Sequence, residues 1–363
     1  MSKRNQHYVP QFHLRQWSDD GKLISIYNKK NKIFVSNKMA ISNFASKKYL
    51  YDKDGSLENI LSEVEYHVAP IYKKIIDTKT LDGLSEDDID LLYLYLVLCN
   101  ERTVANGDLY EKSVKERLGA ILGIYQAHGQ YMDVDISTLK DLIYVEHPCN
   151  GAIIAAFKWY KCISDLNLVI IKNNSETEFI SSDYPAIKYN LWSLKRNLIS
   201  GWGLSSVGIM FVLPISPRIA LFAYDDVIYR PQFLENRIID ISQKEQIDEI
   251  NKLMFLNANN AIFFSSRISN DYVKLLCDDM ADYDVKTDAT SVLGNSERKI
   301  ILNFSPHTLY QADIHFFDIL QESFLWDVPN NAAGLIRPMS EKLSEYAETL
   351  WEEMISEINS QSE

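Results

Sequence analysis

The chain has 363 residues, of which 46% are hydrophobic and 24% charged; this balance is typical of a folded soluble protein and excludes a disordered one. Its longest apolar run, DLLYLYLVLC at residues 90–99, is shorter than the roughly 20 residues needed to cross a bilayer. The net charge of −13 disfavours nonspecific binding to nucleic acid. Residues 1–50, however, carry ten lysines and arginines and only two acidic residues. This basic segment either forms a surface for an anionic ligand or attracts the acidic remainder of the protein within the fold.

The first predicted elements are short strands. KLISIY at residues 22–27 and KIFVS at 32–36 flank the turn-prone NKKN, so we expect a hairpin with lysines at its turn. KKYLYD at 47–52 predicts a third short strand.

The pattern then changes to a helical period. From Leu57 to Ile75 the apolar residues recur on one helical stripe. Ser85 and Asp88 form a capping-box pattern, which predicts the start of a very apolar helix over residues 86–104. Further helices are predicted over residues 108–128, 136–145 and 151–163.

The second half of the chain is richer in β-forming residues. Strands are predicted over 166–172, 177–182, 208–216, 218–224 and 261–266, and helices over 242–257 and 270–282.

Together these elements predict an α+β fold in which a helical middle packs on mixed or mainly antiparallel strands, as a single intertwined unit covering residues 1–363. Within that unit the composition distinguishes four parts: a basic N-terminal hairpin segment (1–56), a helical region (57–163), a strand-rich region (164–330) and an acidic C-terminal helix (340–358).

Motifs of several well-understood enzyme classes are absent from the sequence. Without GxxxxGK[ST], GxGxxG opening a βαβ unit, HExxH or GxSxG, the chain is not expected to be a P-loop NTPase, a Rossmann dehydrogenase, a zincin or an α/β-hydrolase. Its four cysteines are widely spaced without a CxxC pair, which predicts free thiols rather than a zinc site. The N-terminus lacks the apolar region of a signal peptide, so we expect a cytoplasmic protein.

The stretch NQHYVPQFHLRQW at residues 5–17 is too rich in large side chains to be a loose tail. His7 within it is a candidate metal ligand or general base, because imidazole titrates near neutral pH. The alternative is a hydrogen-bonded packing residue beside Tyr8 and Phe12.

Two carboxylates follow on the first long helix. Glu58 and Glu65 lie seven residues apart, which places both on one flank of the apolar stripe, two turns from each other. At the edge of a core they can bind a hard divalent cation or hold an arginine, or they are the ordinary acidic border of an amphipathic helix.

Two further candidates lie at the ends of predicted elements. Arg102 ends the most apolar helix, where it can neutralise the terminal carbonyls or bind a carboxylate or phosphate in a fork. Asp183 follows the predicted strand FISS and precedes Pro185, so a strand end presents its carboxylate. Its alternative role is to cap its own loop in an Asx-turn.

The opening QHYVPQFHLRQW resembles that of a bacterial family known as domain of unknown function 4238, whose members begin HYVPxFxL. Later residues match the family in order: glutamates spaced like Glu58 and Glu65, the pair Arg102–Thr103, Trp159, the turn Ser182–Asp183–Pro185 and the segment Pro214–Ser216–Pro217. The sequence departs from the family at Tyr184, where asparagine is usual. The resemblance covers most of the chain and brings no established activity, but it implies that His7, Glu58, Glu65, Arg102 and Asp183 belong to one site.

These residues predict a metal-assisted phosphodiester hydrolase, most simply a nuclease. His7 and Asp183, with Glu58 or Glu65, would bind one or two Mg²⁺ or Mn²⁺ ions, because oxygen-rich sites suit these metals. His7, Arg102 and Asp183 would be the catalytic residues, with Arg102 stabilising charge on the phosphate. By analogy alone, such an enzyme would suit bacterial defence or a toxin.

The partner predicted with this activity is nucleic acid, whose backbone would follow the basic residues Arg15, Lys29, Lys30 and Lys32. The competing hypothesis is a non-catalytic binding or regulatory protein. In it, the same polar residues form a buried network that docks the N-terminal segment onto the helices, and no metal is needed.

Overall fold

The computed structural model describes residues 5–198, 201–283, 290–294, 299–303, 309–326, 336–337, 345–346 and 349. The helices in this part of the chain are α1 (Gln11–Leu14), α2 (Ser56–Thr78), α3 (Glu86–Glu101), α4 (Val104–Ala127), α5 (Ile136–Leu142), α6 (Cys149–Trp159), α7 (Leu191–Lys195), α8 (Lys244–Asn257) and α9 (Asn270–Asp279). The strands are β1 (Asn5–His7), β2 (Leu23–Asn28), β3 (Ile33–Ala40), β4 (Ser46–Lys48), β5 (Asn167–Asn173), β6 (Ser181–Ser182), β7 (Ile187–Tyr189), β8 (Met210–Pro214), β9 (Ile219–Tyr224), β10 (Tyr229–Pro231), β11 (Leu234–Glu235), β12 (Ile238–Ile241), β13 (Ala261–Phe264), β14 (Thr290–Gly294), β15 (Lys299–Asn303) and β16 (Phe317–Ile319).

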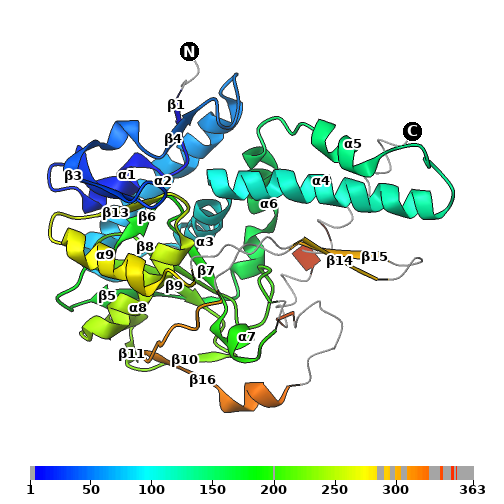
Figure 1. The fold of residues 1–363 in the computed structure, drawn as a ribbon. Coiled ribbons are helices and arrows are strands. Elements are labelled where there is room, and N and C mark those ends of the chain that lie inside the picture. The colour runs from blue at the N-terminus through cyan, green and yellow to red at the C-terminus, as the bar shows by residue number, and fades with distance from the viewer. Residues whose placement is uncertain are drawn as a thin grey trace.

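The largest sheet has six strands in the order β11-β12-β5-β9-β8-β7. Its strands β12 and β5 run parallel, whereas its other neighbouring strands run antiparallel. A four-stranded antiparallel sheet has the order β3-β2-β13-β6 and joins the N-terminal hairpin to the second half of the chain. Long helices accompany these mixed and antiparallel sheets, so the predicted α+β fold is confirmed (Figure 1).

The central strands of the six-stranded sheet are buried on both faces. Successive side chains of a strand point in opposite directions, so each strand contributes to a core on either side. On β5, Leu168 and Ile170 pack in a core with residues of α2, α3 and α6, whereas Val169 and Ile171 pack in a second core with residues of α8 and α9. The sheet therefore forms a middle layer between two layers of helices. Helices α4 and α5 project from this body in Figure 1.

Several predicted elements form where local signals are strong. The hairpin β2–β3 and the pair β8–β9 are present, and α3 begins with a complete capping box between Ser85 and Asp88. The strand predicted over residues 47–52 is the three-residue β4, which pairs with β1 rather than with the hairpin. No helix in the described ranges is long and apolar enough to span a bilayer.

The strand predicted over residues 177–182 is largely wrong, since only Ser181 and Ser182 form β6. The reason is that the preceding backbone groups bond outside a strand ladder: the N–H of Phe179 donates to Pro217 O at 3.0 Å and that of Ile180 to Asn251 Oδ1 at 3.0 Å. The acidic helix predicted over residues 340–358 lies outside the described residues, apart from positions 345, 346 and 349.

Candidate functional site

The N-terminal motif is fastened to the chain that follows it. Strand β1 pairs with β4, and the N–H of Tyr8 donates to Ala45 O at 2.8 Å. The side chain of Gln6 is fully buried: its amide nitrogen donates to Asp52 Oδ1 at 2.7 Å, and its amide oxygen accepts from the N–H of Tyr51 at 2.7 Å. Because a buried amide needs all these partners, Gln6 fixes the position of β1 against residues 51–52.

Arg102 is the centre of this docking. Its guanidinium is 1% exposed and its Nη1 donates to Glu65 Oε1 at 2.8 Å, while its Nη2 donates to the backbone oxygen of His7 at 2.5 Å. The same guanidinium approaches the hydroxyl of Tyr51, with Nε at 3.4 Å from the oxygen. The arginine at the end of α3 therefore ties α2 to the N-terminal strand.

The hydroxyl of Tyr51 completes the same network. It donates to His7 O at 3.2 Å, and burial raises the pKa of Tyr51 above its ordinary value, so the group stays a neutral donor. Smaller influences on that pKa come from the charges of Arg102 and Glu58. Glu58 is buried in the first turn of α2. Of the predicted pair, Glu65 contacts Arg102 directly, whereas the backbone N–H of Glu58 donates to Asp52 at 3.3 Å.

The imidazole of His7 is partly buried and bonded at both ring nitrogens. Its Nδ1 lies 3.1 Å from Phe44 O, and its Nε2 lies 3.0 Å from the side-chain nitrogen of Gln11. Because a carbonyl oxygen can only accept, Nδ1 carries the proton in the neutral ring and Nε2 accepts from Gln11. The Gln11 oxygen in turn accepts from Arg15 Nη2 at 3.1 Å. His7 is therefore one end of a chain of hydrogen bonds that reaches the surface at Arg15.

Asp183 lies at the end of β6, where the sequence predicted a presented carboxylate. The side chain is 4% exposed, and its two oxygens accept from the backbone N–H groups of Asn259 at 2.9 Å and Asn260 at 2.8 Å. The N–H of Asp183 donates to Ala261 O at 3.0 Å. The carboxylate thus caps the turn between α8 and β13, instead of its own loop as in an Asx-turn.

Two tyrosines bring the predicted motifs together. Burial raises the pKa of Tyr8, and the charge of Asp183 raises it further. Burial also raises the pKa of Tyr184, whose side chain hydrogen-bonds to Thr103 at the end of α3. The N-terminal motif, the Arg102–Thr103 pair and the Asp183 turn therefore converge in space.

Two of the predicted metal ligands, Glu65 and Asp183, bond to other protein groups. No cluster of three or more histidine, cysteine, aspartate or glutamate side chains suited to a metal occurs within the residues that the structure describes. Glu65 faces the buried guanidinium of Arg102, and both oxygens of Asp183 accept from the backbone. Mg²⁺ and Mn²⁺ require several oxygen ligands converging on one point, and these side chains converge on other protein groups.

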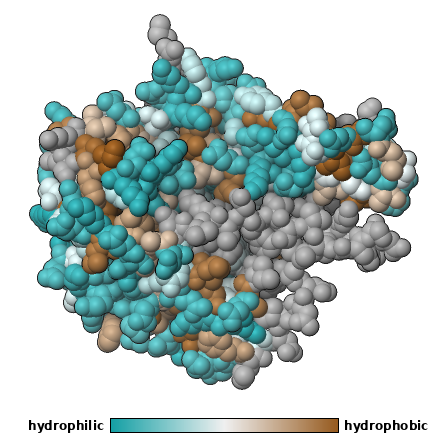
Figure 2. Space-filling view, in the orientation of Figure 1, coloured by the Kyte–Doolittle hydropathy of each residue, from teal (hydrophilic) through white to brown (hydrophobic). Residues whose placement is uncertain are grey.

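The four predicted nucleic-acid contacts fall into two groups. Arg15, Lys30 and Lys32 are exposed, whereas Lys29 turns inward to the end of α8. There its ammonium donates to Phe255 O at 2.8 Å and to Ala258 O at 3.1 Å, which offsets the negative end of the helix dipole. Lys47 and Lys48 on β4 are also exposed. Hydrophilic residues dominate the surface over β4 and α2 in Figure 2.

A second histidine of the motif has a role that sequence reasoning did not find. His13 is fully buried, and its Nε2 lies 2.9 Å from Ser181 Oγ. In the described part of the chain its Nδ1 has no hydrogen-bond partner. Burial lowers the pKa of His13 to about 3, so the ring is neutral in the folded protein at any pH above that value.

His13 therefore makes stability depend on pH. Below pH 6.5 the unfolded chain takes up a proton at His13 that the folded chain does not, so stability is lost as the pH falls. Over this range the free energy of unfolding should fall by about 1.4 kcal/mol per pH unit on account of this residue. Urea unfolding of wild type and His13→Gln between pH 7 and pH 4 measures it, because glutamine retains a polar atom for Ser181 without titrating. Parallel pH profiles for the two proteins would contradict the prediction.

The sequence matches the model of a known protein family. The family described as Protein of unknown function (DUF4238) matches residues 5–267, a range that contains Gln6, His7, Glu65, Arg102 and Asp183. No curated protein and no solved structure matches the chain. Because the match covers more than half of the sequence and begins at the N-terminal motif, the chain belongs to the DUF4238 family.

Proposed function

We propose that the chain is a non-catalytic binding protein, and that its basic N-terminal segment binds nucleic acid. The observation that carries the first half of this proposal is the contact set of Arg102: a buried guanidinium bonded to Glu65 and to the backbone of His7. With Asp183 also bonded to two backbone N–H groups, the polar residues of the motif serve to dock one segment on another. A rigid docking of this kind orders a surface for a partner.

The choice of nucleic acid rests on charge. Residues 1–50 carry ten lysines and arginines with two acidic residues, on a chain whose net charge is −13. A polyanion is therefore attracted by this segment and repelled by the remainder. Arg15, Lys30, Lys32, Lys47 and Lys48 are exposed and available to phosphates.

The test compares two triple variants of equal charge. Arg15→Gln/Lys30→Gln/Lys32→Gln removes three positive charges from the N-terminal segment, and Lys73→Gln/Lys195→Gln/Lys274→Gln removes three exposed charges elsewhere. Fluorescence anisotropy with labelled 20-nucleotide single- and double-stranded RNA and DNA gives the Kd at several salt concentrations. In the first variant we expect weaker binding and a salt slope smaller by about 2 to 3, because each phosphate contact contributes about one unit. The second variant should bind like wild type.

Two outcomes contradict this proposal. Equal weakening in both variants would mean that only overall charge matters, and no binding by wild type at low salt would remove nucleic acid as the partner. Either result would favour the alternative that the basic N-terminal segment attracts the acidic remainder of the protein within the fold.

The metal-assisted nuclease is a second candidate, favoured by one observation. His7 is partly buried rather than sealed, so the imidazole of this candidate general base is accessible to solvent. The same labelled nucleic acids, incubated with and without Mn²⁺, test it alongside a His7→Ala/Asp183→Ala double variant. Cleavage that requires both the metal and the two residues would replace the binding proposal.

A further inference from the structure

A pocket of about 330 Å³ lies away from the N-terminal segment, between the end of α2, the turn after β5 and the start of β9. Lys79, Lys172 and Arg218 contribute the positive charges of its lining, and Asn173 and Ser175 contribute polar atoms. The motif residues described above take no part in it. The carboxylates nearby do not pair with all of these positive charges.

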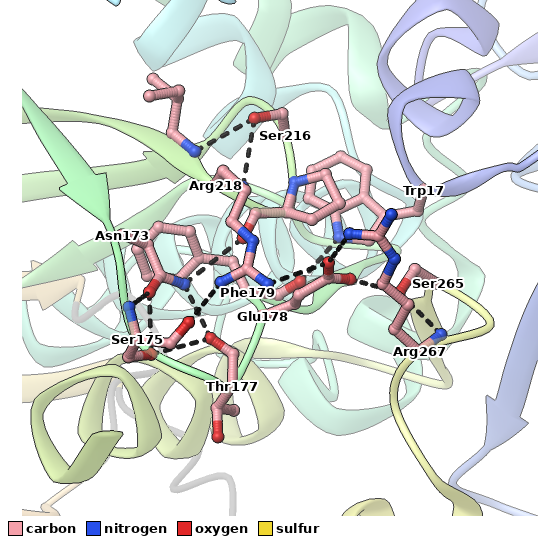
Figure 3. Close-up of polar contacts among 12 residues, drawn as sticks. Trp17, Asn173, Ser175, Thr177, Glu178, Phe179, Ser216, Arg218, Ser265 and Arg267 are labelled. Atoms are coloured by element: carbon pink, nitrogen blue, oxygen red, sulfur yellow. Dashed lines mark hydrogen bonds and ion pairs between the residues drawn. The ribbon is translucent and has the colours of Figure 1, made fainter. Parts of the chain in front are cut away.

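Arg218 belongs to an arrangement of two arginines around one buried carboxylate (Figure 3). Glu178 is 3% exposed; its Oε1 lies 3.3 Å from Arg218 Nη2 and 3.3 Å from Arg267 Nη1, and its other oxygen accepts from Ser265. Arg218 Nη1 also donates to Ser175 O. One carboxylate cannot neutralise two guanidiniums, so the group keeps an excess positive charge while its geometry is fixed.

Arg218 retains a donor for a ligand. Among the described residues its Nε has no hydrogen-bond partner, although both of its other nitrogens are bonded. A guanidinium that is held in place by a buried carboxylate and a carbonyl binds an oxyanion without losing further side-chain freedom.

Lys79 adds a second uncompensated charge. It ends α2 in the left-handed conformation, with φ of 57°, a position at which glycine is the usual residue. Within the described ranges its ammonium has no ion-pair or hydrogen-bond partner. Lys172, by contrast, is paired with Asp240 at 2.9 Å. The excess charge of the pocket therefore comes from Lys79 and from Arg218, which shares the single carboxylate of Glu178 with Arg267.

We propose that this pocket binds a phosphate group. A fixed arginine donor and a free ammonium are the pair that recognises phosphate oxygens, the first by directed bonds and the second as a point charge. The amide of Asn173 and the hydroxyl of Ser175 are bonded within the turn and shape its wall. A volume of about 330 Å³ exceeds one phosphate and leaves room for a small substituent, so the phosphate is either free or part of a nucleotide.

Lys79→Gly is the sharpest variant for this proposal. It removes the ammonium and, because glycine adopts positive φ without strain, it should keep or raise the melting temperature. Titration calorimetry with inorganic phosphate, at ionic strength held constant with sodium chloride, should give a Kd at least tenfold higher than that of wild type. Lys73→Gln, on the same helix and also exposed, should leave the Kd unchanged.

Arg218→Gln should weaken phosphate binding at least as much, and Lys79→Gly keeps the proposal testable if the arginine variant folds poorly. Adenosine 5′-monophosphate is titrated in parallel: tighter binding than inorganic phosphate would support the site and identify a nucleotide, and equal binding would support the site with the phosphate group alone. Saturable phosphate binding that Lys79→Gly leaves unchanged would overturn the proposal. So would the absence of saturable binding by wild type.

Discussion

Replacing Glu65 with alanine is expected to lower the free energy of unfolding by about 3 kcal/mol. The guanidinium of Arg102 is 1% exposed and its carboxylate partner lies 2.8 Å away, so the variant leaves a buried charge without its counter-ion. The backbone oxygen of His7 and the hydroxyl of Tyr51 still accept from the arginine, which places the loss at the lower end of the range for a broken buried ion pair. Urea unfolding followed by circular dichroism measures it.

The same helix supplies a matched control. Glu63 is two residues away, 72% exposed, and paired with His67 at 3.1 Å on the surface. Because exposed i,i+4 pairs contribute little, Glu63→Ala should cost no more than about 0.5 kcal/mol. A similar loss in both variants would mean that the bond to Arg102 does not explain the effect, because alanine favours a helix at least as much as glutamate does.

The contact between Glu65 and Arg102 shows which part of the site can be predicted from the sequence. The seven-residue spacing correctly places Glu58 and Glu65 on one flank, because helical geometry is local. It cannot say which charge faces that flank. Arg102 follows 37 residues later, at the end of another helix, and the packing of α2 on α3 decides the contact. The sequence therefore predicts the arginine and the carboxylate as candidates but leaves open whether they bind a ligand or each other.

Gln6 and Lys29 also have contacts that residue type alone does not predict. Gln6 is uncharged and next to His7, which is the more obvious candidate. Nothing in its residue type predicts a fully buried side chain that is hydrogen-bonded to Tyr51 and Asp52. Lys29 lies in a lysine-rich hairpin turn, and its type predicts exposure. Its partners are carbonyls at the end of α8, more than 220 residues away in the sequence. In both cases tertiary contacts decide the role.

Prediction of the shortest strands fails for a related reason. Capping and helical periodicity extend over many residues, so α3 and its capping box are correctly predicted from local signals. Strands of two or three residues, such as β6 and β7, carry too few positions for a period-two pattern. Their existence depends on the partner strands β13 and β8, which the sheet supplies from elsewhere in the chain.

Asp183→Ala is expected to lower the free energy of unfolding by about 3 to 5 kcal/mol. The carboxylate accepts two backbone hydrogen bonds, and each bond to a charged acceptor contributes about 1.5 to 3 kcal/mol. Its removal leaves the N–H groups of Asn259 and Asn260 without their acceptor in a partly buried turn, which adds a desolvation cost. Asp183→Asn should cost about half as much, because one amide oxygen can still accept one of the two bonds.

The exposed Asp226 provides the control for this experiment, since its carboxylate accepts from the side chain of Asn167 at 2.9 Å on the surface. Asp226→Ala should change stability by no more than about 0.5 kcal/mol.

The three variants also separate the two proposed functions. If Asp183 caps the turn between α8 and β13, loss of stability precedes any loss of nucleic-acid binding, and folded Asp183→Asn binds like wild type. An Asp183→Asn protein with wild-type stability and no nuclease activity would instead assign the carboxylate to catalysis. A metal ligand or general base does not tolerate replacement of the carboxylate by an amide, whereas a turn cap loses only one hydrogen bond.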